Sequence, residues 1–302
     1  MCEIAHNAPF VLNPGMAKWT AAEIPDQTGR VAVVTGANSG LGLSASRELA
    51  RHGASVVMAV RDMAKGERAL AAVEEVLSGD RTGRHAVSPN RPAAATLRRL
   101  DLASLSSIED FSTQLHSEHG GGIDLLINNA GVMAPPRRET ADGFELQLGT
   151  NFLGHFALTG RVIDLLLGVD GSRVVTVSSN AHKMGRINFD DLQSTRRYMR
   201  WQAYGQSKLA DLSFALELDR RLRAAGAKTI SVAAHPGYAA TNLQTAAPPL
   251  LDRLLMQATN VLVAQNADMG ALPILYAATQ PGLEGGSYVG PDGIGEFRGH
   301  PR

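Results

Sequence analysis

Short apolar runs alternate with amphipathic stretches along most of the chain. The run RVAVVTG, residues 30–36, ends in glycine, and apolar residues recur at helical spacing from Leu43 to His52. This pattern predicts a strand buried on both faces, followed by a helix. Gly53 stands where a left-handed residue would end that helix, and a second apolar run covers 54–60. The segment therefore predicts one strand–helix–strand unit.

The same alternation continues along the chain. It predicts helices near 65–77 and 106–119 and further strands that end at 100–102 or cover 123–131, 173–179 and 229–237. Strands that alternate with helices form a parallel sheet, because each crossover helix must lie on one face of the sheet. We therefore expect an α/β fold in which residues 25–302 form one doubly wound domain with helices on both faces.

Two segments lack this alternation. Residues 1–24 contain no sustained period, which predicts an arm outside the domain, and translation from Met1 or Met16 is left open. Residues 78–96 predict a solvated loop, for which a basic anion site is the alternative.

Composition narrows the class of protein. Lys and Arg total 29 and Asp and Glu total 29, so the formal net charge is zero and no global field favours nucleic acid. The single cysteine, Cys2, excludes an intrachain disulfide and a cysteine-rich metal site. The sequence contains no run of about 18 apolar residues, so no membrane span is predicted. We expect a cytoplasmic protein that binds a small molecule, no metal and no nucleic acid.

The first candidate site is TGANSGLG, residues 35–42, at the turn from the first strand into the first helix. Gly36, Gly40 and Gly42 permit positive φ and a close backbone approach, and the amides of a helix N-terminus favour a phosphate. The spacing G-x-x-x-G-x-G differs from the usual dinucleotide fingerprint G-x-G-x-x-G. The segment is therefore a candidate nucleotide site, with an ordinary structural turn as the alternative.

At this spacing the loop resembles the cofactor loop of classical short-chain dehydrogenases/reductases, and further motifs follow in that family's order. DLAS at 101–104 resembles its adenine-side aspartate, NNAG at 128–131 the end of its central strand, and PGYAAT at 236–241 its nicotinamide-side loop. The resemblance implies a Rossmann fold with a nicotinamide cofactor. The implied cofactor residues are Gly36, Asn38, Ser39, Gly40, Leu41, Gly42, Arg61, Asp101, Leu102, Asn129, Ala130, Gly131, Tyr204, Lys208, Pro236, Gly237 and Thr241.

Four residues resemble the family's catalytic set. In YGQSK, Tyr204 and Lys208 are four positions apart, so on a helix both side chains project from one face. Ser179 ends an apolar run and is favoured by the resemblance, with the adjacent Ser178 as the alternative. Asn151, in GTNFLGHF, resembles the asparagine of the family's fourth helix.

Reduction of a carbonyl by hydride leaves negative charge on the substrate oxygen, so a positioned group must supply a proton. The resemblance implies that Tyr204 is this general acid, or the base in the reverse direction. It implies that Lys208 lowers the pKa of Tyr204 and binds the ribose, that Ser179 holds the substrate oxygen, and that Asn151 supports a proton-relay water.

The end of the second strand bears on the choice of cofactor. Val60 occupies the position where NAD-preferring relatives carry an acid, and Arg61 follows it. Loss of the acid removes a partner of the 2′-hydroxyl, and a guanidinium favours a 2′-phosphate. NADP(H) is therefore favoured over NAD(H). The alternative is Asp62, 20 residues after Gly42, and Ser39 stands where many NADP-binding relatives carry a basic residue.

The substrate region resembles one subgroup of the family. Ser179 and Tyr204 are separated by 25 positions, and the segment that joins them and the tail 288–301 resemble retinol-dehydrogenase-like and protochlorophyllide-reductase-like enzymes. The apolar stretch 242–264 is placed where the family forms a small C-terminal substrate lid. This implies an apolar substrate such as a retinoid, a steroid or a lipid aldehyde; burial against the domain or another subunit is the alternative.

The resemblance also implies a homodimer or homotetramer built on the fourth and fifth helices, roughly 143–167 and 204–224. A monomer is the alternative, because the insertion before Tyr204 would obstruct that surface. Two other functions remain open: a catalytically silent NADP-sensing protein, and a nucleotide-sugar epimerase or dehydratase. The glycine spacing of residues 36–42 differs from that of the latter class.

Overall fold

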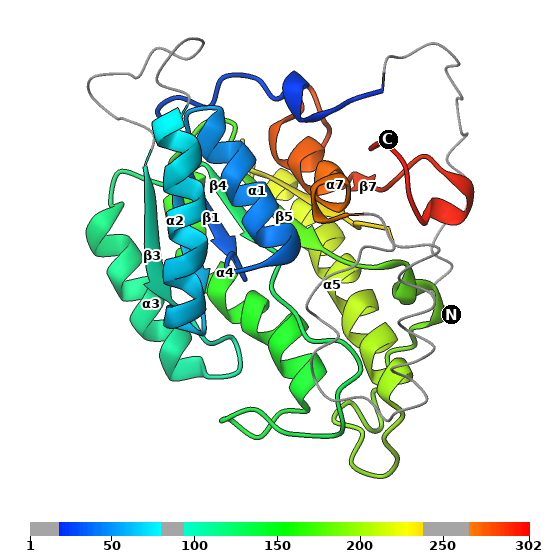
Figure 1. The fold of residues 1–302 in the computed structure, drawn as a ribbon. Coiled ribbons are helices and arrows are strands. Elements are labelled where there is room, and N and C mark those ends of the chain that lie inside the picture. Colours follow the sequence, from blue (N-terminus) through cyan, green and yellow to red (C-terminus); the bar gives the residue numbers. More distant parts are fainter. Residues whose placement is uncertain (1–17, 80–93, 238–265) are drawn as a thin grey trace.

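A seven-stranded parallel sheet forms the centre of the molecule (Figure 1). The structure, a computed structural model, describes residues 18–79, 94–237 and 266–302. The strands are β1 (Val31–Thr35), β2 (Ser55–Val60), β3 (Ala95–Arg99), β4 (Leu125–Asn128), β5 (Arg173–Val177), β6 (Ile230–Ala234) and β7 (Tyr288–Val289). Their order in the sheet is β3-β2-β1-β4-β5-β6-β7.

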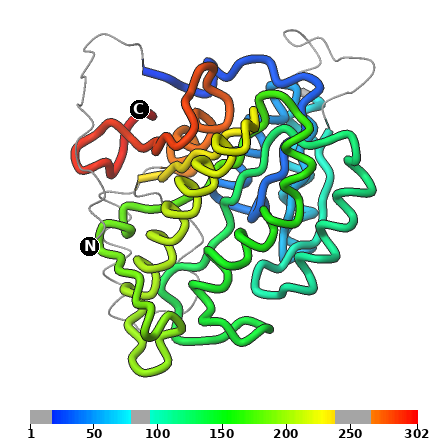
Figure 2. The backbone as a smooth tube through the Cα atoms, turned by 180° about the vertical axis from the view of Figure 1, so that it is seen from behind, coloured from blue at the N-terminus to red at the C-terminus, as the bar shows by residue number. Residues whose placement is uncertain are grey.

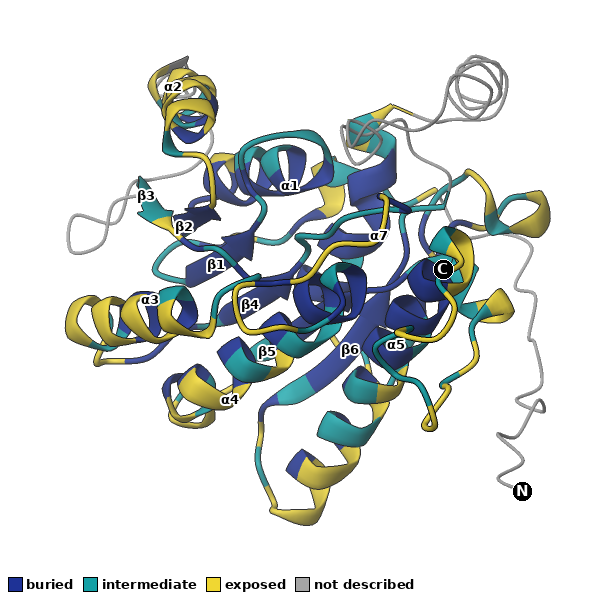
Figure 3. Cartoon of the chain, turned by 90° about the horizontal axis from the view of Figure 1, so that it is seen from below, coloured by how far each residue is buried: buried dark blue, intermediate teal, exposed yellow. Residues whose placement is uncertain are grey.

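Helices cover both faces of this sheet, as Figure 3 shows in a view along it. One layer contains α1 (Gly40–Arg51), α2 (Met63–Gly79) and α7 (Ala267–Thr279); the other contains α3 (Leu105–Glu118), α4 (Gly154–Leu167) and α5 (Arg200–Ala224). Alternate residues of β1 serve the two cores: Ala32 and Val34 pack toward α1 and α7, whereas Val31 and Val33 pack toward α3 and α4. Because both faces are buried, β1 is apolar without alternation. The expected doubly wound α/β fold is confirmed.

The strand order places a crevice at the centre of the sheet. β1 pairs with β2 on one side and with β4 on the other, so the chain leaves the carboxyl ends of β1 and β4 in opposite directions. In open parallel sheets, ligands bind outside the carboxyl ends of the strands at such a switch point. This edge of the sheet is therefore where a site is expected.

Several boundaries differ from those that the sequence pattern predicted. The third strand ends at Arg99 instead of 100–102, α2 continues to Gly79, and a π-helical turn, Leu148–Leu153, precedes α4. The pattern also missed α7, which contains Pro273, and the two-residue strand β7. A proline and a two-residue length both weaken the periodic signals on which such predictions depend.

The last part of the predicted arm lies against the domain. Thr20 and Glu23 form a capping box around a short 3-10 turn, Ala21–Glu23, and Ile24 is buried in the core. The Trp19 ring meets the Tyr276 ring of α7 edge-on at 5.3 Å. Figure 2 shows this segment beside the C-terminal segment, where the Nδ1 atom of His300 lies 2.8 Å from the Trp19 carbonyl oxygen.

In the part of the chain that the structure describes, no helix combines the length and apolar character needed to cross a bilayer. The predicted lid, 242–264, and Thr241 lie outside the described residues.

Candidate active site

A cavity of about 910 Å³ opens at the carboxyl ends of β1, β2, β4 and β5. Sixteen of the predicted cofactor residues line it, that is, all of those within the described ranges: Gly36, Asn38, Ser39, Gly40, Leu41, Gly42, Arg61, Asp101, Leu102, Asn129, Ala130, Gly131, Tyr204, Lys208, Pro236 and Gly237. Segments far apart in the sequence therefore meet around one space.

The glycine loop forms one wall of this cavity, and its backbone requires glycine. Gly36 and Gly40 have φ of +68° and +56°, in the left-handed region. A Cβ atom on Gly42 would lie 2.4 Å from the Gly36 carbonyl oxygen. Ser39 precedes α1 without a side-chain cap, so it leaves the first amides of that helix available to an anion.

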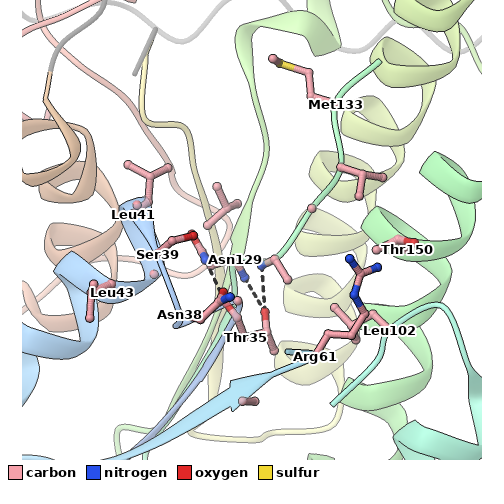
Figure 4. A pocket seen from close by; sticks show the side chains of 18 of the residues that line it. Thr35, Asn38, Ser39, Leu41, Leu43, Arg61, Leu102, Asn129, Met133 and Thr150 are labelled. Atoms are coloured by element: carbon pink, nitrogen blue, oxygen red, sulfur yellow. Dashed lines mark hydrogen bonds between the residues drawn. The ribbon is translucent and has the colours of Figure 1, made fainter. Parts of the chain in front are cut away.

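A set of hydrogen bonds fixes the loop to the next strand of the sheet (Figure 4). The Thr35 hydroxyl accepts from the backbone amides of Asn129 and Ala130 at 2.9 and 3.0 Å, and Asn129 Nδ2 donates to the Thr35 carbonyl at 2.8 Å. These bonds join the carboxyl ends of β1 and β4. The floor of the cavity is therefore fixed by hydrogen bonds between the segments that end β1 and follow β4.

A buried histidine that the sequence reasoning missed supports this floor. His155 places Nε2 2.9 Å from the Thr35 hydroxyl and Nδ1 2.7 Å from the Asn151 carbonyl oxygen. A carbonyl only accepts, so Nδ1 carries the proton and the Thr35 hydroxyl donates to Nε2. Burial lowers the pKa of His155 to about 3, so the ring is neutral. Its signal in the sequence is a histidine four positions after Asn151.

We expect this histidine to make the fold sensitive to acid. Its folded pKa of about 3 lies below its ordinary value of 6.5, so the unfolded chain binds the extra proton between those values and stability falls as the pH drops through that window. His155 alone should remove about 2 kcal/mol of unfolding free energy between pH 7 and pH 5. Urea unfolding of wild type and His155→Gln at both pH values measures this, and the variant should lose correspondingly less.

The control is His116→Gln. His116 pairs with Asp164 at 3.0 Å, and its pKa is raised, with a hydrogen bond to the Ser112 carbonyl as the largest cause. The His116→Gln variant should therefore lose at least as much unfolding free energy between pH 7 and pH 5 as wild type does. If wild type and His155→Gln lost the same unfolding free energy between pH 7 and pH 5, the role of His155 in acid sensitivity would be contradicted. Both proteins should still lose some stability in acid, because burial also lowers the pKa of His235, to about 4.

The tyrosine and lysine of YGQSK meet the cavity from α5. Tyr204 and Lys208 are only 7% and 5% exposed, and both line the cavity. Lys208 Nζ donates to the Val177 carbonyl at 2.9 Å and to Asp211 Oδ2 at 2.8 Å. Burial favours the neutral amine, but the charges of Asp211 and Tyr204 raise the pKa of Lys208. The ammonium is therefore held charged at the end of β5.

The two adjacent serines have different hydrogen-bonding roles. Ser178 donates its hydroxyl proton to the Lys208 carbonyl at 2.7 Å. Ser179 uses its oxygen to accept from the Ala181 amide at 3.2 Å, which leaves its proton available for a ligand oxygen. Both line the cavity, and this geometry favours Ser179 over Ser178 as the donor to a substrate.

Asn151 lies behind the cavity and is not among its lining residues. It belongs to the π-helical turn before α4, and it is fully buried. Its Oδ1 accepts from the Val132 amide at 2.8 Å, and its Nδ2 donates to the Val132 carbonyl at 3.0 Å and to Ser207 at 2.9 Å. The family resemblance implied that Asn151 supports a proton-relay water; in the structure its side chain is occupied by these protein contacts. Its backbone carbonyl accepts from His155 Nδ1 at 2.7 Å and has a second lone pair that can accept a further hydrogen bond.

Three cationic side chains and one acidic side chain line the cavity beyond β2: Arg61, Asp62, Lys65 and Arg68. Asp62 accepts from the Lys65 amide at 3.1 Å and lies 3.6 Å from Lys65 Nζ. The hydrogen bond from that amide lowers the pKa of Asp62. Asp62 is therefore engaged by Lys65 at the start of α2.

The insertion before Tyr204 is anchored to the segment before the π-helical turn. Tyr198 donates its hydroxyl to the Pro135 carbonyl at 2.9 Å and accepts from Gln147 Nε2 at 2.9 Å. His182 lies 3.2 Å from the Tyr288 hydroxyl. Among the described residues that line the cavity, neither Tyr198, His182 nor Trp201 appears, so the contacts of Tyr198 and His182 favour packing roles for them.

Comparison with known proteins identifies the family. A family described as short chain dehydrogenase matches residues 30–249. Polyprenol dehydrogenase of Mus musculus is 41% identical over 285 residues, which cover 92% of this chain and 81% of that protein. Retinol dehydrogenase 14 of Homo sapiens is 40% identical over 265 residues, covering 87% and 78% respectively.

A solved structure agrees with these matches. The crystal structure of an uncharacterized protein from Mycobacterium paratuberculosis superposes with a TM-score of 0.73 at 45% identity, covering 95% of this chain and 88% of that one. The chain is therefore an oxidoreductase that belongs to the short-chain dehydrogenase/reductase family, in its retinol-dehydrogenase-like subgroup.

Proposed function

We propose that the protein transfers hydride between NADP(H) and an apolar carbonyl or alcohol. The observation that supports this most is the meeting of Tyr204, Lys208 and Ser179 in the cavity that the glycine loop also lines. Acid, cation and hydrogen-bond donor thus border the space in which a dinucleotide would lie.

The cavity fits a dinucleotide. The uncapped N-terminus of α1 and the glycines of the loop provide an anion cradle, which a Cβ on Gly42 would distort by clashing with the Gly36 carbonyl. Asp101 and Leu102 would lie on the adenine side, Asn129 to Gly131 along the middle, and Pro236 with Gly237 near the nicotinamide. Bound there, the cofactor supplies or accepts the hydride.

The residues of this chain then manage the proton and the charge. In reduction, Tyr204 donates its hydroxyl proton to the oxygen that gains charge, while Ser179 donates a hydrogen bond to the same oxygen. Lys208 stabilises the tyrosinate that results and donates to the ribose. In oxidation the same groups act in reverse, with Tyr204 as the base. The Asn151 carbonyl, rather than its side chain, would hold a relay water.

The charges beyond β2 favour the phosphorylated cofactor. Arg61, Lys65 and Arg68 give three positive charges at the adenine end, and Asp62 already pairs with Lys65. A 2′-phosphate would form charge-assisted hydrogen bonds there, whereas a 2′-hydroxyl would find its acidic partner engaged.

We infer an apolar substrate of isoprenoid or lipid character. The related proteins are named for polyprenol and retinol, which are long apolar alcohols. Val132 and Met133 add apolar surface to the cavity beside Gly131. A homodimer or homotetramer is part of the proposal, because Phe156 of α4 is 55% exposed and packs on Phe214 of α5 at 5.6 Å.

Isothermal titration with NADPH and NADH tests the cofactor assignment. We expect wild type to bind NADPH more tightly, and Arg61→Ala to weaken NADPH by about tenfold or more, the size of one charge-assisted phosphate contact, with little effect on NADH. Arg99→Ala is the matched control: it removes the same charge from the adjacent strand, outside the lining residues.

Each outcome separates the candidate functions. Preference for NADH in wild type would overturn the role of Arg61, and binding of neither would overturn the enzyme assignment. A broad panel of aldehydes, ketones and alcohols follows the titration. Tight NADPH binding without turnover of any member would favour the sensing protein instead.

A further inference from the structure

A second buried charge lies beside the catalytic lysine. Asp211 follows Lys208 by one helical turn on α5, is 1% exposed, and accepts from Lys208 Nζ through Oδ2 at 2.8 Å. Its other oxygen, Oδ1, is buried with no hydrogen-bond partner among the described residues. Asp211 does not line the cavity, and among the described residues the one polar contact of its side chain is with Lys208, which does line it.

This arrangement is costly for the fold and needs a reason. A carboxylate removed from water loses its hydration, and a buried ion pair recovers that loss only when its remaining lone pairs are also satisfied. Here they are not, and burial raises the pKa of Asp211 to about 6 although Lys208 opposes the shift. Apolar residues at both positions would avoid this loss, so the pair is explained by a need for the Lys208 ammonium at the cavity rather than by stability.

We propose that Asp211 is a positioning residue of the reaction: it holds the Lys208 ammonium at the end of β5 and offsets part of the charge that Lys208 presents to Tyr204. The inference rests on the function proposed above. Its consequence is that Tyr204 keeps its proton to a higher pH than it would beside an unpaired lysine. Asp211 therefore favours the protonated acid that carbonyl reduction requires.

The surrounding groups leave this role to Asp211. His155, on α4, is neutral because burial lowers its pKa to about 3, and burial raises the pKa of Tyr288, on β7, well above its ordinary range. In the turn that follows β5, burial lowers the pKa of His182, and Lys183 pairs with Glu296 at 2.8 Å. Among the described residues, Asp211 is thus the anionic group in direct contact with Lys208.

The substitution that isolates the charge is Asp211→Asn. It keeps the shape and an oxygen that accepts from Nζ, and the Val177 carbonyl still holds the ammonium. The full charge of Lys208 then acts on Tyr204, so Tyr204 should ionise at a pH lower by at least about half a unit, a conservative figure for one nearby charge. The alkaline limb of reduction and the acid limb of oxidation should both shift downward by the same amount.

Two measurements read this shift. The first is the ultraviolet absorbance of tyrosinate against pH, with the Tyr204→Phe variant subtracted in each background; it needs neither cofactor nor substrate. The second is the pH profile of kcat/KM with the best substrate of the carbonyl panel. Failure to bind NADPH or to turn over any substrate would overturn the proposed function, while the absorbance titration would still test Asp211.

Asp219→Asn is the matched control. Asp219 is a fully buried carboxylate on the same helix, eight residues further along, and pairs with Arg223. Its loss should lower stability without moving either titration. An unchanged or upward shift in Asp211→Asn, or an equal shift in Asp219→Asn, would overturn the proposal. If Asp211→Asn fails to fold, Asp211→Ser, which is smaller and also keeps an accepting oxygen, provides the same comparison.

Discussion

Replacing Tyr204 with phenylalanine is expected to lower kcat for carbonyl reduction by about 10²–10⁴-fold, the usual contribution of a positioned proton donor. The substitution removes only the hydroxyl. The ring meets Trp201 edge-on at 6.2 Å and is 7% exposed, and phenylalanine preserves both the contact and the burial. NADPH affinity should therefore stay within about threefold of wild type, a smaller change than the loss of one hydrogen bond to the cofactor would cause. Steady-state kinetics and isothermal titration on the same preparation measure the two quantities.

Tyr276→Phe supplies the control for this experiment. Tyr276 lies on α7 against Trp19, outside the cavity lining, so its loss should leave kcat unchanged. If Tyr204→Phe retained more than about a tenth of the wild-type kcat, a different group would have to donate the proton. A parallel loss of NADPH binding would instead show that the hydroxyl mainly holds the cofactor.

The parts of the site that depend on local spacing were predictable from the sequence. A strand, a glycine turn and a helix follow one another between Val31 and Arg51, and the backbone constraints of that turn leave a direct mark on residue type. The four-residue separation of Tyr204 and Lys208 likewise fixes their common face on α5. Their meeting with the loop follows from the parallel topology, because every strand delivers its carboxyl end to the same edge.

The parts that depend on contacts between remote segments were not predictable in this way. The Asn151 side chain is directed to Val132 by the π-helical turn, whose extra residue leaves no periodic signal. The role of His155 depends on Thr35, 120 positions away. Asp211 follows a helical spacing that on an exposed helix would indicate only a solvated ion pair; burial makes its charge significant.

The second large effect is expected at the glycine that closes the loop. An alanine at Gly42 would place its Cβ 2.4 Å from the Gly36 carbonyl oxygen and 2.6 Å from Asn129 Nδ2. Neither neighbour can move freely: Gly36 is backbone, and Asn129 donates to the Thr35 carbonyl at 2.8 Å. We expect Gly42→Ala to lower the free energy of unfolding by about 1–3 kcal/mol, the usual cost of overpacking. NADPH affinity should fall by about tenfold or more, since the displaced loop loses at least one phosphate contact.

Gly160→Ala separates this clash from the general effect of alanine in a helix. Gly160 lies within α4, and nothing lies within 4 Å of the position that its Cβ would take. There alanine should raise the free energy of unfolding by about 0.5–1 kcal/mol through reduced backbone entropy, with NADPH affinity unchanged. Chemical denaturation and isothermal titration of both variants decide the matter. If Gly42→Ala were as stable as Gly160→Ala and bound NADPH like wild type, the loop would tolerate a side chain there, and close backbone approach would not be what the site requires of Gly42.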